Sequence, residues 1–165
     1  MALYFLDTSA LVKLYVQEPG TDRLLQLVGD QSENRFAVLA VSVVEIRSAI
    51  RRRQRAGDID AAAAAAVLES VQKHMESRFL RQVINDTVID TALEMIDRYA
   101  LRAYDGLQLA GCLVLCGIAN EAFTFICSDH RLLDAARSEQ LRVLDPAAFE
   151  GAEPISGEGV DDARR

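Results

Sequence analysis

Short apolar runs recur along the chain and alternate with longer segments of helical character. Short apolar runs bounded by polar residues are typical of strands, and continuous ones are typical of buried strands. We predict strands at residues 3–6, 36–41, 79–84, 122–127 and 141–144. Because strands alternate with helices, we predict a single α/β domain. Its sheet of four or five strands should be mostly parallel and carry helices on both faces.

The segments between these runs predict seven helices, at about residues 10–16, 21–28, 42–55, 61–75, 86–99, 104–118 and 129–137. The run of alanines near residue 61 fits this pattern because alanine is the best helix former. The polar segment 29–35 is predicted to be a loop. Residues suited to begin or end helices stand at the expected positions: Thr8 or Ser9, Thr21 or Asp22, Gly57, Asp58 or Asp60, and Asn85 or Asp86.

Composition narrows the class of protein. The chain has 165 residues and is half hydrophobic, which is enough for one domain with a sizeable core. Its net charge of -7 argues against binding nucleic acid through overall charge, since neutralising phosphates needs a basic surface. An enzyme acting on nucleic acid would therefore need a local basic patch. We assign residues 1–149 to the domain and residues 150–165, which have little apolar content, to a disordered tail.

The three cysteines lie in apolar surroundings and are expected to be reduced core thiols of a cytoplasmic protein. Cys112 and Cys116 are four residues apart on one predicted helix and could bind a soft metal. No nearby histidine completes such a set, so core packing is the preferred interpretation. The beginning of the chain does not resemble a signal peptide, and no apolar run approaches the roughly 20 residues of a membrane span. We expect no membrane association.

Four carboxylates are predicted to share one edge of the sheet. Asp7, Glu45 and Asp129 each follow a predicted strand, and Asp105 begins the most apolar helix. In open α/β sheets, ligands bind at the carboxyl ends of the strands. Taken singly, each acid could simply cap a helix, and Ser42 with Glu45 fits a capping box. Together, four such carboxylates would repel one another, and Mg²⁺ or Mn²⁺ would relieve that repulsion because hard cations prefer carboxylate oxygens.

Four motifs in order resemble those of PIN-domain nucleases, in particular the VapC-type toxins of toxin–antitoxin pairs. They are Phe5 to Tyr15 followed by Glu18-Pro19-Gly20, then Ser42 to Ile46, Tyr104 to Ala110 and Ile126 to Leu133. The resemblance covers about residues 1 to 149. Two positions depart from the family pattern, Gly106 where alanine is usual and Cys127 where threonine is frequent. The second departure bears on the hydrogen bonding around Asp129.

The resemblance implies hydrolysis of RNA phosphodiesters with Mg²⁺ or Mn²⁺. Asp7 and Asp105 would be the principal metal ligands, and Glu45 and Asp129 would complete the catalytic site. The resemblance also implies a cognate antitoxin and a homodimer. Asp134 is a weaker acidic candidate on the last helix. The side chains expected to support the acids by hydrogen bonding are those of Thr8, Ser9, Gln108 and Ser128.

A dense basic patch begins two residues after Glu45. Arg47, Arg51 and Arg55 recur every four residues, with Arg52 and Arg53 beside them. Arg47 and Arg51 are candidates for contact with substrate phosphates. A solvated helix face that pairs with acidic neighbours or with a partner protein explains the same pattern equally well.

Two other functions fit an acidic pocket. A phosphatase with Asp7 as nucleophile is disfavoured because Ser9 stands where a second aspartate would be needed. A non-catalytic module, either resembling a phospho-receiver or using a degenerate acidic pocket for binding, is disfavoured because all four acids are present. His74 and His130 are isolated in the sequence. His130 follows Asp129 and could contact substrate, but a surface position is the preferred interpretation.

Overall fold

A five-stranded sheet, parallel throughout, organises the parts of the chain that the computed structural model describes, residues 2–29 and 34–148. The strand order is β3-β2-β1-β4-β5, so β1 lies at the centre. The α/β class and the parallel sheet predicted from the sequence are confirmed, and every strand begins and ends within two residues of its prediction. The strands are β1 Ala2–Leu6, β2 Asn34–Leu39, β3 Phe79–Gln82, β4 Thr124–Ile126 and β5 Arg142–Leu144.

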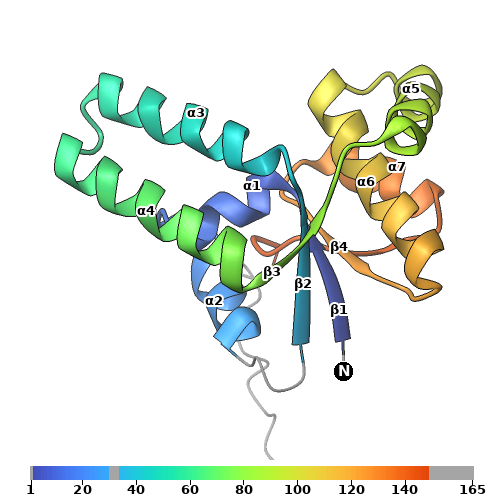
Figure 1. The fold of residues 1–165 in the computed structure, drawn as a ribbon, viewed down its shortest axis with the longest axis horizontal. Helices are drawn as coiled ribbons and strands as arrows, with labels where there is room; N and C mark the ends of the chain where they lie inside the picture. The colour runs from blue at the N-terminus through green and yellow to red at the C-terminus, as the bar shows by residue number, and fades with distance from the viewer. Residues whose placement is uncertain (1, 30–33, 149–165) are drawn as a thin grey trace, which may run out of the picture.

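Helices cover both faces of the sheet (Figure 1), and all seven predicted helical segments are present. One prediction was wrong in detail, because the segment expected at 10–16 is a short α-helix continued by the 3₁₀ helix η1, Val12–Leu14. Its cap is Asp7 and neither Thr8 nor Ser9. The helices are α1 Thr8–Leu11, α2 Thr21–Gly29, α3 Ser42–Ala56, α4 Ala61–Ser77, α5 Asp86–Tyr99, α6 Ala103–Ala119 and α7 His130–Ser138.

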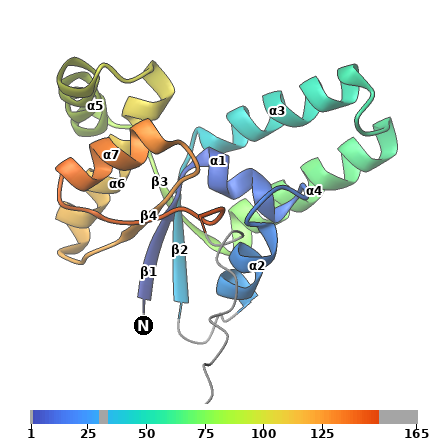
Figure 2. The ribbon, with the colours of Figure 1, turned by 180° about the vertical axis from the view of Figure 1, so that it is seen from behind.

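Two hydrophobic cores lie on opposite faces of the sheet. Successive strand residues point to opposite faces, so Phe5 packs with α5, α6 and α7 while Leu6 packs with α1 to α4. Figure 2 shows the two groups of helices on either side of the strands. Because both faces are covered, β1 is apolar throughout and β2 is apolar from Phe36 to Leu39. This explains why they appear in the sequence as continuous runs.

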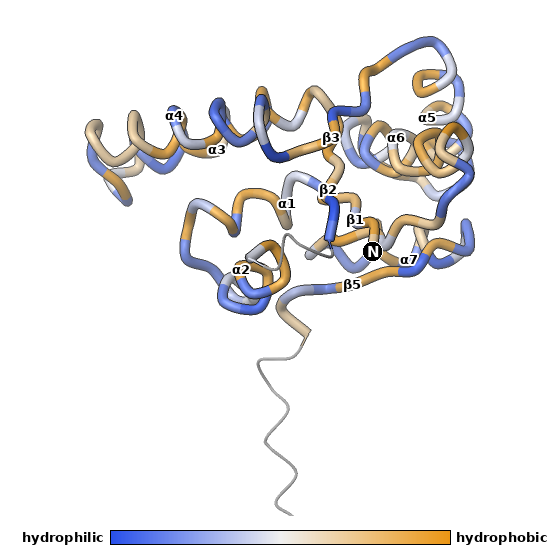
Figure 3. Tube along the Cα trace, turned by 60° about the horizontal axis from the view of Figure 1, so that its bottom comes forward, coloured by the Kyte–Doolittle hydropathy of each residue, from blue (hydrophilic) through white to orange (hydrophobic). Residues whose placement is uncertain are grey.

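Several helix ends follow from capping residues that the sequence indicated. Asp60 and Asn85 accept hydrogen bonds from backbone N–H groups of Ala63 and Val88 at the starts of α4 and α5. Gly57 ends α3 with a φ of 84°, in the left-handed region that glycine adopts readily. Between these ends, α3 and α4 form a hairpin that projects from the sheet (Figure 1). In Figure 3 hydrophobic and hydrophilic residues are mixed along the hairpin of α3 and α4, and the buried residues of α3 are Ser42, Ile46 and Ile50.

Glycines allow α6 to lie unusually close to its neighbours. A Cβ atom at Gly111 would lie 2.7 Å from the Leu39 side chain of β2. One at Gly106 would lie 2.6 Å from the Ile96 side chain of α5. Real Cβ atoms do not approach so closely, so glycine at 106, where the family usually has alanine, fits the tight packing of α5 against α6. The close approach brings the first turns of α6 to the strand ends.

Some predictions fall wholly or partly outside the described residues. The proposed tail, 150–165, lies outside them, as do residues 30–33 of the predicted loop. The ends of that predicted loop belong to α2 and β2 instead, since α2 extends to Gly29 and β2 begins at Asn34. Within the described residues, no helix is long and apolar enough to cross a membrane.

Candidate active site

A cleft of about 570 Å³ opens at the carboxyl ends of the central strands, and all four predicted acids line it. Asp7 directly follows β1, and Asp129 caps α7 just after β4. Glu45 and Asp105 lie in the first turns of α3 and α6. Four segments that are far apart in the sequence therefore contribute one carboxylate each. The topology of the parallel sheet accounts for this convergence.

Asp7 is the most buried of the four acids, with 5% of its surface exposed. Its Oδ2 accepts a hydrogen bond from the backbone N–H of Ser9 at 2.9 Å, and the thiol of Cys127 lies 3.6 Å away. Burial raises the pKa of Asp7 from 3.8 to about 6, and the negative charge of Glu45 adds to the rise. The bonds from Ser9 and Cys127 oppose it. Asp7 is therefore a carboxylate whose ionised form would gain from a nearby cation.

Glu45 is held by side chains from two other elements and does not take part in a capping box. Its Oε2 accepts hydrogen bonds from the Thr8 hydroxyl and the Gln108 amide, each at 2.7 Å. The predicted box is wrong because Val41 precedes α3 as its N-cap without a side-chain bond. The Ser42 hydroxyl is instead turned toward Thr8 and Gln108, at 3.2 and 3.0 Å. Glu45 is thus oriented by Thr8 and Gln108 and not by a capping hydrogen bond within its own helix.

Gln108 connects the two halves of the sequence within the site. It is 1% exposed, and its amide nitrogen reaches Thr8, Ser42 and Glu45 at 2.7–3.0 Å. Its own carbonyl oxygen is buried and has no hydrogen-bond partner among the described residues. The sequence placed Gln108 one turn after Asp105, and the structure adds the partners that fix its position.

Asp105 and Asp129 are more exposed than Asp7. Burial raises the pKa of Asp105, and the neighbouring charge of Asp129 raises it further, while Arg102 and Arg131 lower it. Asp129 accepts a hydrogen bond from the backbone of Leu132, as expected of a cap. These two acids are therefore electrostatically coupled across the cleft.

The cysteine that departs from the family pattern takes part in the hydrogen bonding between two acids. The thiol of Cys127 lies near Asp7 and accepts a hydrogen bond from the backbone N–H of Asp129 at 3.2 Å. Ser9 accepts a hydrogen bond from the backbone of Ser128 at 3.0 Å. The Ser128 hydroxyl is buried without a partner among the described residues. It does not bond Asp129 in this arrangement.

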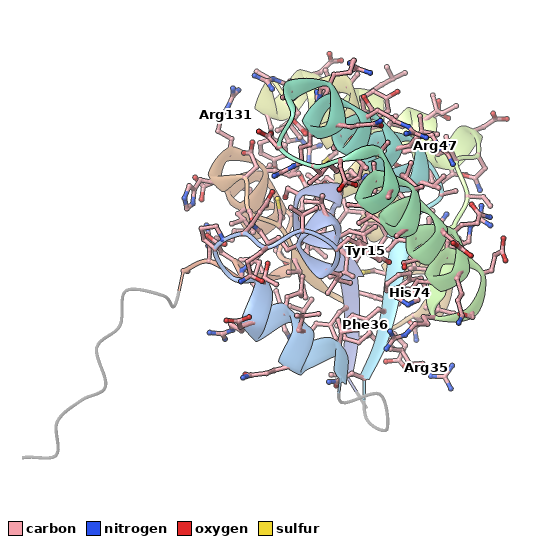
Figure 4. The ribbon with its side chains drawn as sticks, turned by 90° about the vertical axis from the view of Figure 1, so that its left-hand side faces the viewer. Tyr15, Arg35, Phe36, Arg47, His74 and Arg131 are labelled. Carbon is pink, nitrogen blue, oxygen red and sulfur yellow. The ribbon has the colours of Figure 1, made fainter. Side chains whose placement is uncertain are left out.

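Basic residues line the same cleft, but they are not the pair predicted to contact substrate. Arg52, Arg53, Arg102 and Lys13 line it. Arg47 and Arg51 line a separate hollow between α3 and α4. Figure 4 shows Arg47 on the hairpin side of the molecule, well apart from Arg131 of α7. Contact of Arg47 or Arg51 with RNA stays a prediction.

An ion-pair network in the cleft escaped the sequence analysis. Glu18 accepts from Lys13 at 3.1 Å and is also paired with Arg53. Lys13 is 5% exposed, so a charged side chain is buried here against a carboxylate. The only signal in the sequence was the position of Lys13 and Glu18 within the first family motif. The network joins the segment after α1 to the last turn of α3, and its three residues line the cleft.

The remaining candidates lie outside the cleft. His74 is not isolated as expected, because its Nδ1 lies 3.0 Å from the Tyr15 hydroxyl, and the two rings are neighbours in Figure 4. His130 is exposed. Asp134 is exposed and pairs with Arg137 on its own helix. Cys112 is buried and Cys116 partly buried, and both are free thiols.

The donor chemistry of the cleft fits a hard divalent cation. Carboxylate oxygens are what Mg²⁺ and Mn²⁺ prefer, and a cation among them would offset the repulsion that helps to raise the pKa of Asp7 and Asp105. In the described ranges, no three His, Cys, Asp or Glu side chains form a ready-made metal-binding group. The fit therefore rests on the type of donor and on the shared cleft.

Comparison with known sequences identifies the class of protein to which this fold and this acidic cleft belong. The PIN domain family matches residues 4–138, and the chain belongs to this family. Ribonuclease VapC35 of Mycobacterium tuberculosis, from two strains, is 31% identical over 144 residues, which cover 87% of this chain and 97% of the relative. The family predicted from the four sequence motifs is confirmed.

Solved structures share the fold at low sequence identity. PAE2754 from Pyrobaculum aerophilum is 22% identical with a TM-score of 0.56, covering 87% of this chain and 92% of its own. A toxin–antitoxin complex from Klebsiella pneumoniae is 13% identical with a TM-score of 0.57, covering 87% and 97%. VapBC2 from Rickettsia felis, bound to a DNA fragment from its promoter, is 13% identical with a TM-score of 0.58, covering 86% and 97%.

Proposed function

We propose that this protein is a divalent-metal-dependent endoribonuclease of the VapC type. The observation that carries the proposal is the meeting of four carboxylates from four distant segments in one cleft. The relative named Ribonuclease VapC35 supports RNA as the substrate class. Asp7, Asp105, Glu45 and Asp129 would hold Mg²⁺ or Mn²⁺, which when bound would activate water and offset charge on the phosphoryl group.

The protein's own residues orient two of these acids. Thr8 and Gln108 fix Glu45, and Ser9 fixes Asp7. Such supporting hydrogen bonds set the direction of a ligand and its basicity. Basic side chains on the wall of the cleft would attract phosphates despite the negative net charge of the chain. A local positive wall beside an acidic centre is what a nuclease of this overall charge requires.

The direct test is cleavage of single-stranded RNA by purified protein with Mg²⁺ or Mn²⁺, with and without EDTA. We expect cleavage that EDTA abolishes and that Asp7→Asn lowers by at least about 100-fold, since it removes a charged ligand. Asp90→Asn, an exposed acid on α5, is the matched control. Undiminished cleavage by Asp7→Asn, or cleavage in EDTA, would overturn the proposal. Phosphorylation of Asp7 without cleavage would instead favour a receiver-like module.

We further propose that the chain is the toxin of a toxin–antitoxin pair and forms a homodimer. A structural neighbour described as a toxin–antitoxin complex, from Klebsiella pneumoniae, supports a protein partner. A small reading frame beside this gene, whose product co-purifies with the chain and suppresses RNA cleavage, would be the expected antitoxin. Light scattering of the purified chain tests the dimer. An adjacent product that neither binds nor inhibits would contradict the toxin assignment but not the nuclease assignment.

A further inference from the structure

A second hollow adjoins the acidic cleft and is not explained by metal binding. It has a volume of about 270 Å³ and is lined by Val44, Glu45, Ser48, Arg52 and Tyr104. Glu45 and Arg52 also line the acidic cleft, so the two depressions share a wall. Anything bound in this hollow would lie directly beside the carboxylate site. We call it the Tyr104 hollow.

The lining of the Tyr104 hollow combines an aromatic ring, an aliphatic side chain and a cation. Tyr104 is 48% exposed and Val44 is 56% exposed, so both can contact a ligand in the hollow. Arg52 is exposed and, among the described residues, makes no hydrogen bond or ion pair. Its neighbour Arg53, by contrast, is engaged by Glu18. Arg52 is therefore available to a ligand.

Single-stranded nucleic acid matches this combination. Unpaired bases stack on exposed aromatic rings and on guanidinium planes, while the backbone phosphates contact basic side chains. Tyr104 directly precedes Asp105, and Arg52 lies two turns after Glu45, so both stand next to candidate metal ligands. A nucleotide whose phosphate lies in the acidic cleft would have its base within reach of the adjoining hollow.

We propose that the Tyr104 hollow binds a nucleobase of single-stranded RNA next to the scissile phosphodiester, with Tyr104 as the stacking surface and Arg52 as a phosphate contact. This inference rests on the proposed function and adds a base-binding subsite to it. Stacking is tolerant of base identity. The subsite would therefore select unpaired RNA over duplex RNA more strongly than it selects sequence.

Direct binding can be observed with a single tryptophan. The chain contains no tryptophan, so Tyr104→Trp introduces a unique fluorophore in the hollow. The measurement uses this variant together with Asp7→Asn, which keeps RNA intact, and titrates short single-stranded oligoribonucleotides. We expect quenching by oligonucleotides with bases, and none by abasic oligonucleotides of equal length or by inorganic phosphate. Equal quenching by the abasic strand, or no quenching while the strand binds, would overturn the proposal.

Kinetics test the same subsite without a reporter. Tyr104→Ala should raise KM for single-stranded RNA about fivefold to tenfold, the lower range for loss of one base–aromatic stack. Tyr104→Phe should retain nearly normal KM. Leu93→Ala, which alters an exposed apolar residue on α5, is the control and should leave KM unchanged. Arg52→Ala should also raise KM and weaken its dependence on salt, whereas Arg142→Ala, an exposed arginine on β5 that lines neither depression, should not.

The outcomes separate this inference from the function on which it rests. If the unaltered protein fails to cleave RNA with Mg²⁺ or Mn²⁺, the proposed function falls. If it cleaves and Tyr104→Ala does so with unchanged KM, only the base subsite falls. A second copy of the chain could also cover the Tyr104 hollow. If Tyr104→Ala changes the oligomeric state in light scattering together with activity, contact between copies replaces the base subsite.

Discussion

Asp7→Asn should remove the proposed activity and yet stabilise the metal-free protein at neutral and alkaline pH. The burial of Asp7 raises its pKa from 3.8 to about 6, so the folded protein holds a proton on this carboxyl more tightly than the unfolded chain does. Stability from this group is therefore present at low pH and is lost as the pH rises through about 6. Above that pH, folding must bury the ionised carboxylate.

The size of the effect follows from the two pKa values. At about 1.4 kcal/mol for each pKa unit, the difference between 3.8 and about 6 corresponds to about 3 kcal/mol. Asparagine has no charge to bury, but its added N–H group needs a partner and costs about 1 kcal/mol or more. That cost is the same at every pH, so it does not affect how the stability difference between Asp7→Asn and the unaltered protein changes with pH. The advantage of Asp7→Asn should grow by about 2–3 kcal/mol between pH 4 and pH 8.

The assay is urea unfolding of both proteins in EDTA across this pH range, with the exposed Asp90→Asn as control. Excess Mg²⁺ at pH 8 should stabilise the unaltered protein more than Asp7→Asn, since a ligand that binds only the folded state adds to its stability. A stability difference that stays constant from pH 4 to pH 8 would refute the reasoning. It would mean that the environment of Asp7 does not penalise its charge.

Substitutions at four other positions in the fold and the cleft give further predictions for stability and RNA cleavage. Glu18→Gln should lower the free energy of unfolding by about 1–3 kcal/mol in urea, because it leaves the buried Lys13 without its carboxylate; an unchanged urea midpoint would show that the network is dispensable. Gln108→Leu should lower cleavage, or raise the metal concentration for half-maximal cleavage, by about 10- to 100-fold; normal metal dependence would contradict its orienting role. Gly20→Ala should destabilise by about 1–3 kcal/mol, since φ is +88° and a Cβ would meet backbone at 2.5 Å. Gly117→Ala, which meets nothing within 4 Å in its helix, should stabilise by about 0.5–1 kcal/mol, and equal effects at the two glycines would contradict the geometric explanation.

The sheet could be predicted because a strand that is buried on both faces has an apolar sequence, and such runs can be recognised in the sequence. Strand ends then located Asp7 and Asp129 without knowledge of the packing. The same reasoning located Glu45 just after the second predicted strand, and the start of the most apolar helix located Asp105. What these four residues share is a position relative to the strands, and that position is encoded locally.

The orientation of side chains around the acids was not encoded locally. The capping box of Ser42 and Glu45 is a valid local pattern, but Gln108, distant in sequence, competes for both side chains. Similarly, the four-residue spacing correctly grouped Arg47 with Arg51. It could not indicate which face of α3 meets the cleft, because that depends on where α4 packs.

The strand order determines when the carboxylate set can form during synthesis of the chain. Residues 2–82 supply β1, β2 and β3 with two of the acids, and residues 86–144 supply β4 and β5 with the other two. In the sheet, β1 of the first half pairs with β4 of the second half, and the cleft lies across this pair of strands. Neither half contains a complete carboxylate set. During synthesis the set is completed only when Asp129 has emerged, so an interrupted or severed chain would lack the proposed activity until both halves meet.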